Sequence, residues 1–423
     1  MLRFAQNPMI DMDINSLRIA ILNHIISKQT NQNLIIRLED LNNQENNKNK
    51  DKNILNILSL FSIDYSQVLI QSDNIKYHRQ ISMQLLMQKK AFNCFCSDEA
   101  LQKDKDEAKA QNKPYSYGGF CENLSDEITL DLQAPFTVRI KKPTSDITFT
   151  DTIQGDCRYK PFEVDSFVIL NHQKTPTSDF ASAVDDMLND IDTIIEDKKY
   201  LDNIAKQIHI RNSLEYTKKI QYVHIPSIIN GDQYPIQTLL DDGYLPIAIA
   251  NYIVLLGYDT PSEIFTIEDA IKWFDITKIS QHNVKFDIEK LKTINTKYLE
   301  SMDNLRLSKI LGYADEDIGK LAKLYLEQYA TIKDIKTHID LIFTSKSICK
   351  NFPKEFTQIQ QCLKEAPFID DFDQLLVYIT DKTKLINNNL LVPLQYLLTG
   401  TTKGPKLNQI YPFIKNYLKE IIK

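Results

Sequence analysis

The chain has 423 residues, of which 43% are hydrophobic and 25% charged, and its net charge is -6. A globular chain of this size divides into about two to four domains. The negative net charge argues against non-specific binding along nucleic acid. A protein with this net charge can still carry one local basic face. The sequence shows neither a signal pattern nor an apolar run of about 18 residues, and its six cysteines are irregularly spaced. We therefore expect a cytoplasmic protein with reduced thiols and no membrane contact.

The N-terminal part of the chain has α/β patterning. Apolar residues recur at helical spacing over residues 14–28, and the apolar run 33–38 predicts a buried strand. The polar stretch 41–53 predicts a surface loop that leads into a helix over 54–61. Two further strands are predicted. Residues 136–140 alternate cleanly, residues 166–170 are continuously apolar, and together they indicate a central, largely parallel sheet.

The pattern changes after Gly243. A helix is predicted to open at Pro246, with Ile249, Ile253 and Leu256 on one face, and helical spacing then dominates to the end of the chain. The C-terminal half is therefore predicted to be all-α. This change of pattern alone indicates domain boundaries near 240 and 320.

Glycine is scarce in this chain. It has 10 glycines in 423 residues, and the first is Gly118. Globular proteins average roughly 7% glycine. Phosphate-binding loops use glycines because the backbone must approach the phosphates closely. The first 117 residues therefore lack the residue type from which such a loop is built.

Short motifs in a fixed order give the chain a resemblance along its whole length. They are RFAQNP at 3–8, RLED at 37–40, CFC at 94–96, TPT at 175–177, FASAVDD at 180–186, GYLP at 243–246, TG at 399–400 and GP at 404–405. In this order they resemble bacterial glutamyl-tRNA synthetases, which are class I enzymes that use ATP and Mg²⁺ to join glutamate to tRNA.

The resemblance implies a three-part architecture. The first part is a Rossmann-type catalytic domain with a connecting insertion, and two all-helical parts follow, one contacting the tRNA stem and one binding the anticodon. The implied boundaries are 1–240 for the first part, with the insertion at about 72–165, then 241–320 and 321–423.

The residues that bind ATP in this family are not matched. The family's HIGH motif falls on Asp13, Ile14, Asn15 and Ser16, so that a carboxylate replaces the histidine. Its KMSKS segment falls on SIINGDQYPIQTLLDD at 227–242, which contains no lysine or arginine. Attack of a carboxylate on the α-phosphate of ATP needs cationic groups at the phosphates. We therefore assign no catalytic residue, and binding of ATP and Mg²⁺ is in doubt.

The resemblance also locates the amino-acid pocket. Arg3 and Glu39 match family positions, and Asn7 replaces a serine. Ser178 replaces a tyrosine, and Glu196 replaces the arginine that holds the substrate's side-chain carboxylate. Two like charges about 4 Å apart repel by roughly 4 kcal/mol at an effective dielectric near 20. The exchange therefore predicts a large loss of glutamate affinity. For Arg3 and Glu39, a salt bridge at the strand ends is an equally good interpretation.

The cysteine motif, in contrast, is matched. Cys94, Cys96, Tyr117 and Cys121 have the C-x-C and Y-x3-C spacing of the zinc site in some members of the family. Zinc in structural sites prefers a closed tetrahedral set of soft ligands. The alternative is that Cys94 and Cys96 are a reduced pair on one strand, with Cys121 unrelated.

Lys403 and Lys406 flank the GP motif, which resembles a turn of the anticodon-binding region. Both lysines are candidate phosphate contacts, the alternative being ordinary solvated side chains.

These observations favour a paralogue of glutamyl-tRNA synthetase that has lost, or severely reduced, its ligase activity. It would act by binding tRNA, or a synthetase or amidotransferase partner. The alternatives are an active glutamate–tRNA ligase with an unusual site, and a structural relic that binds neither.

Overall fold

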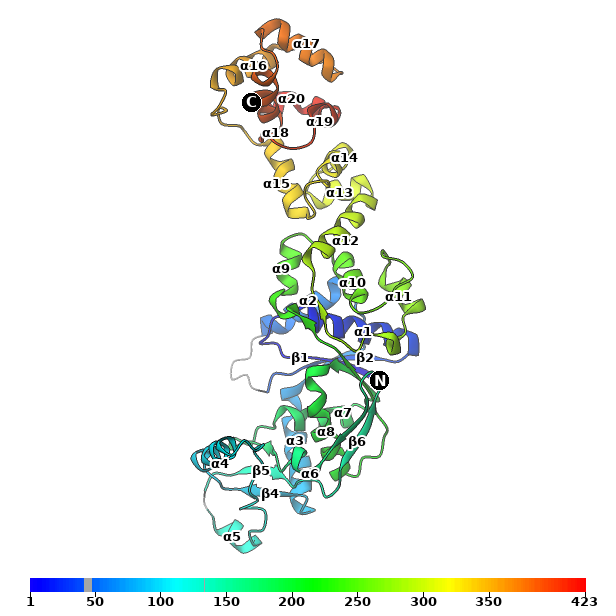
Figure 1. Ribbon diagram of the computed structural model, residues 1–423, viewed down its shortest axis with the longest axis vertical. Coiled ribbons are helices and arrows are strands. Elements are labelled where there is room, and N and C mark those ends of the chain that lie inside the picture. The colour runs from blue at the N-terminus through cyan, green and yellow to red at the C-terminus, as the bar shows by residue number, and fades with distance from the viewer. Residues whose placement is uncertain (42–47, 133) are drawn as a thin grey trace. The chain divides into compact units, whose positions relative to one another are not determined.

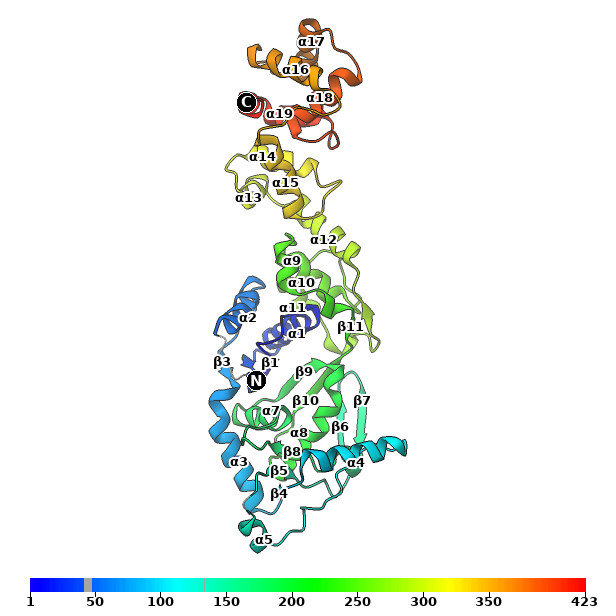
Figure 2. The same ribbon diagram turned by 90° about the vertical axis from the view of Figure 1, so that its left-hand side faces the viewer.

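The computed structural model describes residues 1–41, 48–132 and 134–423. The chain forms two compact units, and both contain two stretches of sequence. One unit holds residues 1–236 with 253–286, and the other holds residues 237–252 with 287–423. In Figures 1 and 2 the first unit is coloured from blue to green, and the helices of the second unit are coloured from green to red.

A seven-stranded sheet forms the centre of the first unit, in the order β3-β2-β1-β9-β10-β6-β7. Its strands are β1 (Leu2–Gln6), β2 (Leu34–Leu38), β3 (Gln67–Ile70), β6 (Ile147–Asp151), β7 (Gly155–Tyr159), β9 (Thr193–Asp197) and β10 (Gln221–Ile225). All neighbours pair in parallel except β6 and β7, which form an antiparallel hairpin. The sheet is the Rossmann-type sheet expected from the sequence.

Helices cover both faces of this sheet. Helix α1 (Ile14–Thr30) packs on β1 and β9, whereas α7 (Ser178–Leu188) and α8 (Leu201–Ser213) lie together on the opposite face (Figures 1 and 2). Leu17, Ile21 and Ile25 of α1 are buried at the spacing that predicted the helix. The sequence therefore located α1 and β2 correctly.

Two predicted strands belong to a different sheet from the one expected. β5 (Thr137–Ile140) and β8 (Val168–Leu170) form a three-stranded antiparallel sheet with β4 (Ala91–Cys94). Their assignment to the central parallel sheet is wrong. The apolar side chains of β5 and β8 are buried against Phe180 and Val184 of α7, in a core of their own. The continuously apolar pattern indicated that the strand is buried, but it did not indicate which strands pair with it.

The predicted loop at 41–53 is partly wrong. Helix α2 (Lys48–Leu60) begins six residues before the expected start at Ile54. Ile54, Ile57 and Leu58 are buried on one face of this helix. An amphipathic helix can carry exposed polar residues on its other face, so a polar stretch does not exclude a helix. Residues 42–47 of the predicted loop lie outside the described residues.

Further helices and two short strands complete the first unit. They are η1 (Gln71–Asn74), α3 (Ile75–Met87), α4 (Asp98–Ala110), α5 (Asp126–Asp131), α6 (Pro161–Val164), η2 (Lys198–Tyr200), β11 (Ile228–Ile229), η3 (Gly231–Gln233), α11 (Ile267–Trp273), η4 (Ile276–Lys278) and β12 (Val284–Lys285). Strands β11 and β12 pair in parallel as a separate two-stranded ribbon.

Helices build the second unit, as the pattern after Gly243 predicted. They are α9 (Ile236–Asp241) and α10 (Pro246–Leu255), both shared with the first unit, α12 (Ile288–Ser301), α13 (Asn304–Ile310), α14 (Glu316–Leu324), α15 (Ile332–Phe343), α16 (Pro353–Glu365), α17 (Phe372–Thr383), α18 (Asn388–Thr399), α19 (Leu407–Ile414), η5 (Lys415–Tyr417) and α20 (Leu418–Ile421). Gly319 lets α14 approach α13, because a Cβ there would lie 1.9 Å from the Asn304 carbonyl oxygen. Among the described residues, no helix is long and apolar enough to cross a bilayer.

Buried charges connect the central sheet to α7. The Asp186 carboxylate is fully buried and accepts hydrogen bonds from Arg3 Nε at 3.0 Å and from Arg37 Nη1 at 2.6 Å. Arg211 of α8 lies 3.9 Å from its other oxygen. Burial opposes ionisation of Asp186, but the three guanidinium groups outweigh burial and hold its pKa below the usual range. One carboxylate thus ties β1, β2, α7 and α8 together.

We expect Asp186→Asn to destabilise the fold by about 3–5 kcal/mol, because it leaves buried guanidinium groups without their counter-charge. Denaturant unfolding at pH 7 measures this loss. The carboxyl pKa is lower in the folded state than the value of about 3.9 in the unfolded state, so its contribution is complete above about pH 4 and is lost below it. The difference in the free energy of unfolding between the wild type and the variant should therefore become smaller at acid pH.

The matched control is Asp190→Asn, at an Asp whose side chain is 77% exposed and paired with Lys218. An exposed pair of this kind contributes at most about 1 kcal/mol. Equal effects of the two substitutions would contradict the structural importance of Asp186.

Candidate active-site pocket and metal centre

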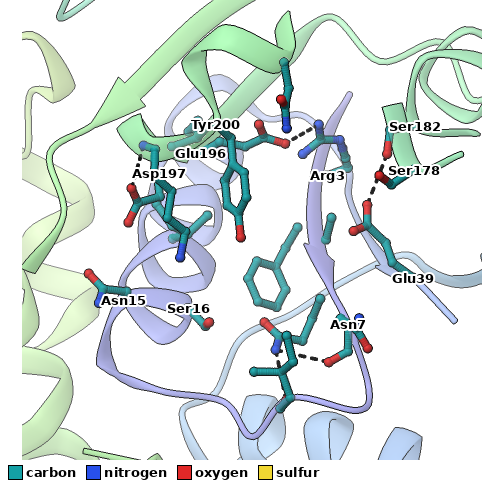
Figure 3. Close-up of a pocket in the computed structure, with 18 of the residues that line it drawn as sticks. Arg3, Asn7, Asn15, Ser16, Glu39, Ser178, Ser182, Glu196, Asp197 and Tyr200 are labelled. Carbon is teal, nitrogen blue, oxygen red and sulfur yellow. Dashed lines mark hydrogen bonds and ion pairs between the residues drawn. The ribbon is translucent and has the colours of Figure 1, made fainter. Parts of the chain in front are cut away.

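A pocket with a volume of about 230 Å³ opens where β1 and β9 end. The strand order reverses between these neighbours, and ligands of parallel α/β sheets bind beside the carboxyl ends of strands at such a switch point. The residues that line the pocket are Arg3, Phe4, Ala5, Gln6, Asn7, Ile10, Asp13, Asn15, Ser16, Ile19, Glu39, Ser178, Asp179, Ser182, Ile195, Glu196, Asp197, Lys199, Tyr200, Asn203 and Gln207 (Figure 3).

The start of α1 forms one wall of this pocket. Asp13 is its N-cap, with extended backbone, and the Asp13 Oδ1 accepts a hydrogen bond of 2.7 Å from the Ser16 amide. Asp13, Asn15 and Ser16 line the pocket, whereas Ile14 is buried in the core. A helix N-terminus attracts anions through its free amides and its partial positive charge. Here the carboxylate of Asp13 already occupies that position.

Asn15 connects this wall to the segment that follows β10. The Ile228 amide donates to Asn15 Oδ1 at 2.7 Å, and Asn15 Nδ2 donates to the Ile228 carbonyl at 3.4 Å. Gly231 packs so closely that a Cβ would lie 2.7 Å from Asn15 Nδ2. The Ile236 amide also donates to the Met12 carbonyl at 2.8 Å. The segment is thus bound directly to the start of α1, a role of Asn15 that the sequence did not indicate.

Arg3 and Glu196 form an ion pair inside the pocket (Figure 3). Arg3 Nη2 lies 2.6 Å from Glu196 Oε1, and the same guanidinium binds the buried Asp186. Burial opposes the charge of Arg3, yet Asp186 and Glu196 hold its pKa above the usual value. Glu39 pairs with Arg37 at 3.0 Å and accepts a bond of 3.3 Å from Ser182. Arg3 and Glu39 therefore both form salt bridges within the protein, as in the alternative interpretation of these two residues.

Behind Glu196 lies a buried histidine. His224 Nδ1 is 2.7 Å from Asp151, and its Nε2 lies 4.0 Å from Glu196 Oε2 without a hydrogen-bond partner among the described residues. Asp151 also accepts the amides of Ile153 and Gln154. The carboxyl group of Glu196 is therefore held between the Arg3 guanidinium and the His224 imidazole.

Asn7 and Asp179 of the pocket each have a side-chain contact with the protein itself. Asn7 Oδ1 accepts the Met9 amide at 2.8 Å, and Ser178 is the first residue of α7. Asp179 lies 3.5 Å from Lys206. Burial raises the pKa of Asp179, Lys206 opposes that rise, and the negative charges of Glu196 and Glu39 add to it.

Negative charge predominates in the pocket lining. Its carboxylates belong to Asp13, Glu39, Asp179, Glu196 and Asp197, against the two cationic side chains of Arg3 and Lys199. Asp197 accepts the Lys199 amide at 2.9 Å and the Ser227 hydroxyl at 2.6 Å. Asp197, Lys199 and Gln207 are not among the site residues predicted from the sequence. The available signal for Asp197 and Lys199 is their position at the end of strand β9, because strand ends at a switch point line the site, whereas Gln207 on α8 carries no such signal.

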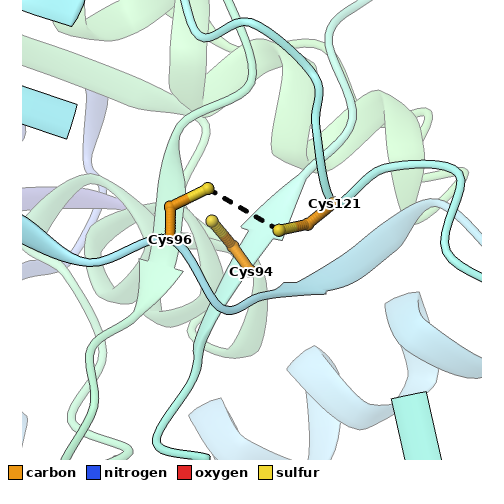
Figure 4. Close-up of side chains that lie close together, drawn as sticks. All are labelled: Cys94, Cys96 and Cys121. Atoms are coloured by element: carbon orange, nitrogen blue, oxygen red, sulfur yellow. Dashed lines mark hydrogen bonds between the residues drawn. The ribbon is translucent and has the colours of Figure 1, made fainter. Parts of the chain in front are cut away.

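Three of the four predicted zinc ligands form one cluster (Figure 4). The sulfur atoms of Cys94, Cys96 and Cys121 all lie within 4.8 Å of one another, and those of Cys96 and Cys121 are 3.6 Å apart. Sulfurs bound tetrahedrally to zinc at about 2.3 Å lie about 3.8 Å apart, so the spacing fits this metal. The Tyr117 hydroxyl lies 3.4 Å from Cys94 and 3.6 Å from Cys96. The residues present can therefore hold zinc.

Arg139 adds positive charge beside the thiols. Its guanidinium lies 4.3 Å above the centre of the Tyr117 ring. Burial opposes ionisation of Cys94, whereas hydrogen bonds from Tyr117 and Arg139 stabilise the thiolate and hold its pKa below the usual value. Burial raises the pKa of Cys96 to about 11. Binding a metal ion would displace the Cys96 proton, since the thiolate is the ligand.

Lys403 and Lys406 lie in the turn between α18 and α19, and both are exposed. Gly400, in the left-handed conformation at φ 76°, ends α18 just before this turn. The two lysines are thus accessible to a molecule that binds to the second unit.

Known proteins match this chain along its length. A family model described as the catalytic domain of class I tRNA synthetases (E and Q) matches residues 1–293. The chain is 45% identical to glutamate–tRNA ligase 2 of Sulfurimonas denitrificans over 433 aligned positions, covering all of both proteins. It is 41% identical to glutamate–tRNA ligase 1 of Campylobacter jejuni, covering 100% of this chain and 99% of that one.

A solved structure supports the fold. The glutamate tRNA ligase from Elizabethkingia meningosepticum in complex with its amino acid matches with a TM-score of 0.80 and 21% identity, covering 100% of this chain and 98% of that one. The architecture is that of a class I aminoacyl-tRNA synthetase. Within this class, the chain belongs to the glutamate–tRNA ligase family.

We expect the purified protein to carry about one zinc ion per chain, and Cys96→Ser to lose it and to lower the melting temperature, because metal binding contributes to folding. Cys157→Ser is the control, since Cys157 lies on β7 outside the cluster. Elemental analysis and thermal unfolding measure both effects. A zinc content near zero in the unmodified protein would refute the site.

Proposed function

We propose that this member of the glutamate–tRNA ligase family binds tRNA in the cytoplasm and has lost, or severely reduced, its ability to activate glutamate. The observation that carries the proposal is the ion pair of 2.6 Å between Arg3 and Glu196. It places a carboxylate inside the pocket and occupies the buried cation there. We regard the chain as a paralogue with degenerate HIGH and KMSKS motifs.

The charge of the pocket argues against glutamate as its ligand. Glutamate carries two carboxylates and one ammonium group, and its side-chain carboxylate needs a cation. Arg3 already has Asp186 and Glu196 as partners, and four further carboxylates line the same space. At an effective dielectric near 20, each like-charge contact at about 4 Å costs roughly 4 kcal/mol. Glutamate binding is therefore strongly opposed.

Nucleotide binding meets the same difficulty. Asp13 caps the helix that would face the phosphates, and Asn15 binds the segment that begins at Ile228 to that helix. Residues 227–242 supply no lysine or arginine to balance a triphosphate. Stabilising the charge of a phosphoryl transition state needs such groups. Activation with ATP and Mg²⁺ is thus opposed by both walls of the pocket.

The helical parts support the tRNA role. We propose that residues 241–320 contact the tRNA stem and residues 321–423 the anticodon, with the exposed Lys403 and Lys406 bound to phosphates. Their turn belongs to the second unit and the pocket to the first, so the loss of ligase chemistry leaves tRNA binding free to persist. A synthetase or amidotransferase partner is a secondary proposal.

Retained ligase activity is the second candidate. The observation that favours it is identity of 41–45% over the full length with proteins named glutamate–tRNA ligase. Glutamate and ATP would then have to bind beside the Arg3–Glu196 pair through other residues.

We expect no tRNA-dependent pyrophosphate exchange above background with glutamate and ATP, because carboxylates outnumber cations in the pocket lining and its buried cation, Arg3, is already paired. Filter binding with tRNA measures association separately and should give a saturable complex. Charging above background would overturn the proposal, and absence of tRNA binding would favour the structural relic.

We expect the pair Lys403→Ala and Lys406→Ala to weaken tRNA binding about equally for different tRNAs and to reduce the slope of log affinity against log salt by about 1–2, because each lysine releases counterions. The control pair Lys272→Ala and Lys278→Ala removes two exposed lysines of the first unit. Unchanged affinity and slope in the first pair would exclude these contacts.

A further inference from the structure

The pocket between β1 and β9 has acceptor groups that the protein leaves unused. Glu39 Oε2 and Asp179 Oδ1 receive no hydrogen bond from the described residues, and Glu196 Oε2 lies 4.0 Å from His224 Nε2, which is beyond hydrogen-bond distance. The pocket thus presents free carboxylate oxygens at three positions.

A buried amide adds an independent indication of a ligand. Gln207 of α8 lines the pocket and is 5% exposed. Its Oε1 accepts no hydrogen bond from the described residues. A buried oxygen without a partner costs about 1–3 kcal/mol, and such groups normally have a protein or ligand donor. The missing partner of this amide oxygen is therefore a hydrogen-bond donor.

Mutual repulsion among the carboxylates points to the same kind of ligand. Burial raises the pKa of Asp179, Lys206 at 3.5 Å opposes that rise, and the negative charges of Glu196 and Glu39 add to it. A cation entering the pocket would lower this repulsion. An ammonium group carries three N–H donors and no acceptor, so it matches a site made of free acceptors.

We propose that the pocket binds a small organic ammonium compound, an amine on an apolar stem about the size of an amino acid, in place of glutamate. Glu196, Asp179 and Glu39 hold the ammonium group, and Gln207 Oε1 accepts one of its N–H groups. Phe4, Ile19 and Ile195 line the space for the stem. This inference rests on the proposed loss of glutamate binding and states what the altered pocket recognises.

The test is isothermal titration of the full-length protein with 1,4-diaminobutane at low ionic strength, where exposed charges are least screened. We expect one saturable site, which Glu196→Gln and Asp179→Asn each weaken about tenfold or more. Asp131→Asn, an exposed residue outside the pocket, should leave the affinity unchanged. Thermal unfolding of each variant shows whether it is folded, and Asp179→Asn leaves the Arg3 ion pairs intact if Glu196→Gln disturbs them.

Titration with glutamate separates the two proposals. Binding of the diamine without glutamate supports both. If neither compound binds, or if both pocket variants bind the diamine as tightly as the wild type does, the amine site is refuted and the proposed function stands. Binding of glutamate alone would overturn both.

Discussion

Guanidinium groups from β1 and β2 meet on a single carboxylate of α7, at the centre of the first unit. Asp186 accepts from Arg3 and Arg37, with Arg211 of α8 nearby. Buried charges of this kind are stable only when each has its counter-charge and its hydrogen bonds. The position of α7 against the sheet, and therefore that of the pocket wall it supplies, depends on this set of contacts.

The same contacts couple the core to the pocket. Arg3 donates from Nε to Asp186 and from Nη2 to Glu196, which belongs to the pocket lining. A fold can keep its apolar pattern while the charges of its site change, because the two involve different side chains. Arg3 is an exception to this separation, since one side chain takes part in both.

Much of the fold could be predicted from the sequence, because apolar spacing reports burial directly. Helix α1 and strand β2 were located this way. The sheet to which β5 and β8 belong could not be predicted, because pairing depends on residues distant in the chain. The cysteine cluster was expected because its motif resembles the zinc site of some members of the family. The binding of Ile228 by Asn15 was not expected, since an asparagine at a helix start looks the same in the sequence whether it contacts solvent or another segment.

The double engagement of Arg3 has a consequence for substitutions at position 196. An arginine there would put a second guanidinium against Arg3 and remove one of its two carboxylate partners. Such a substitution would cost stability, because a buried charge needs its counter-charge. The residue at position 196 is therefore constrained by the core contacts of Arg3 as well as by the ligand of the pocket.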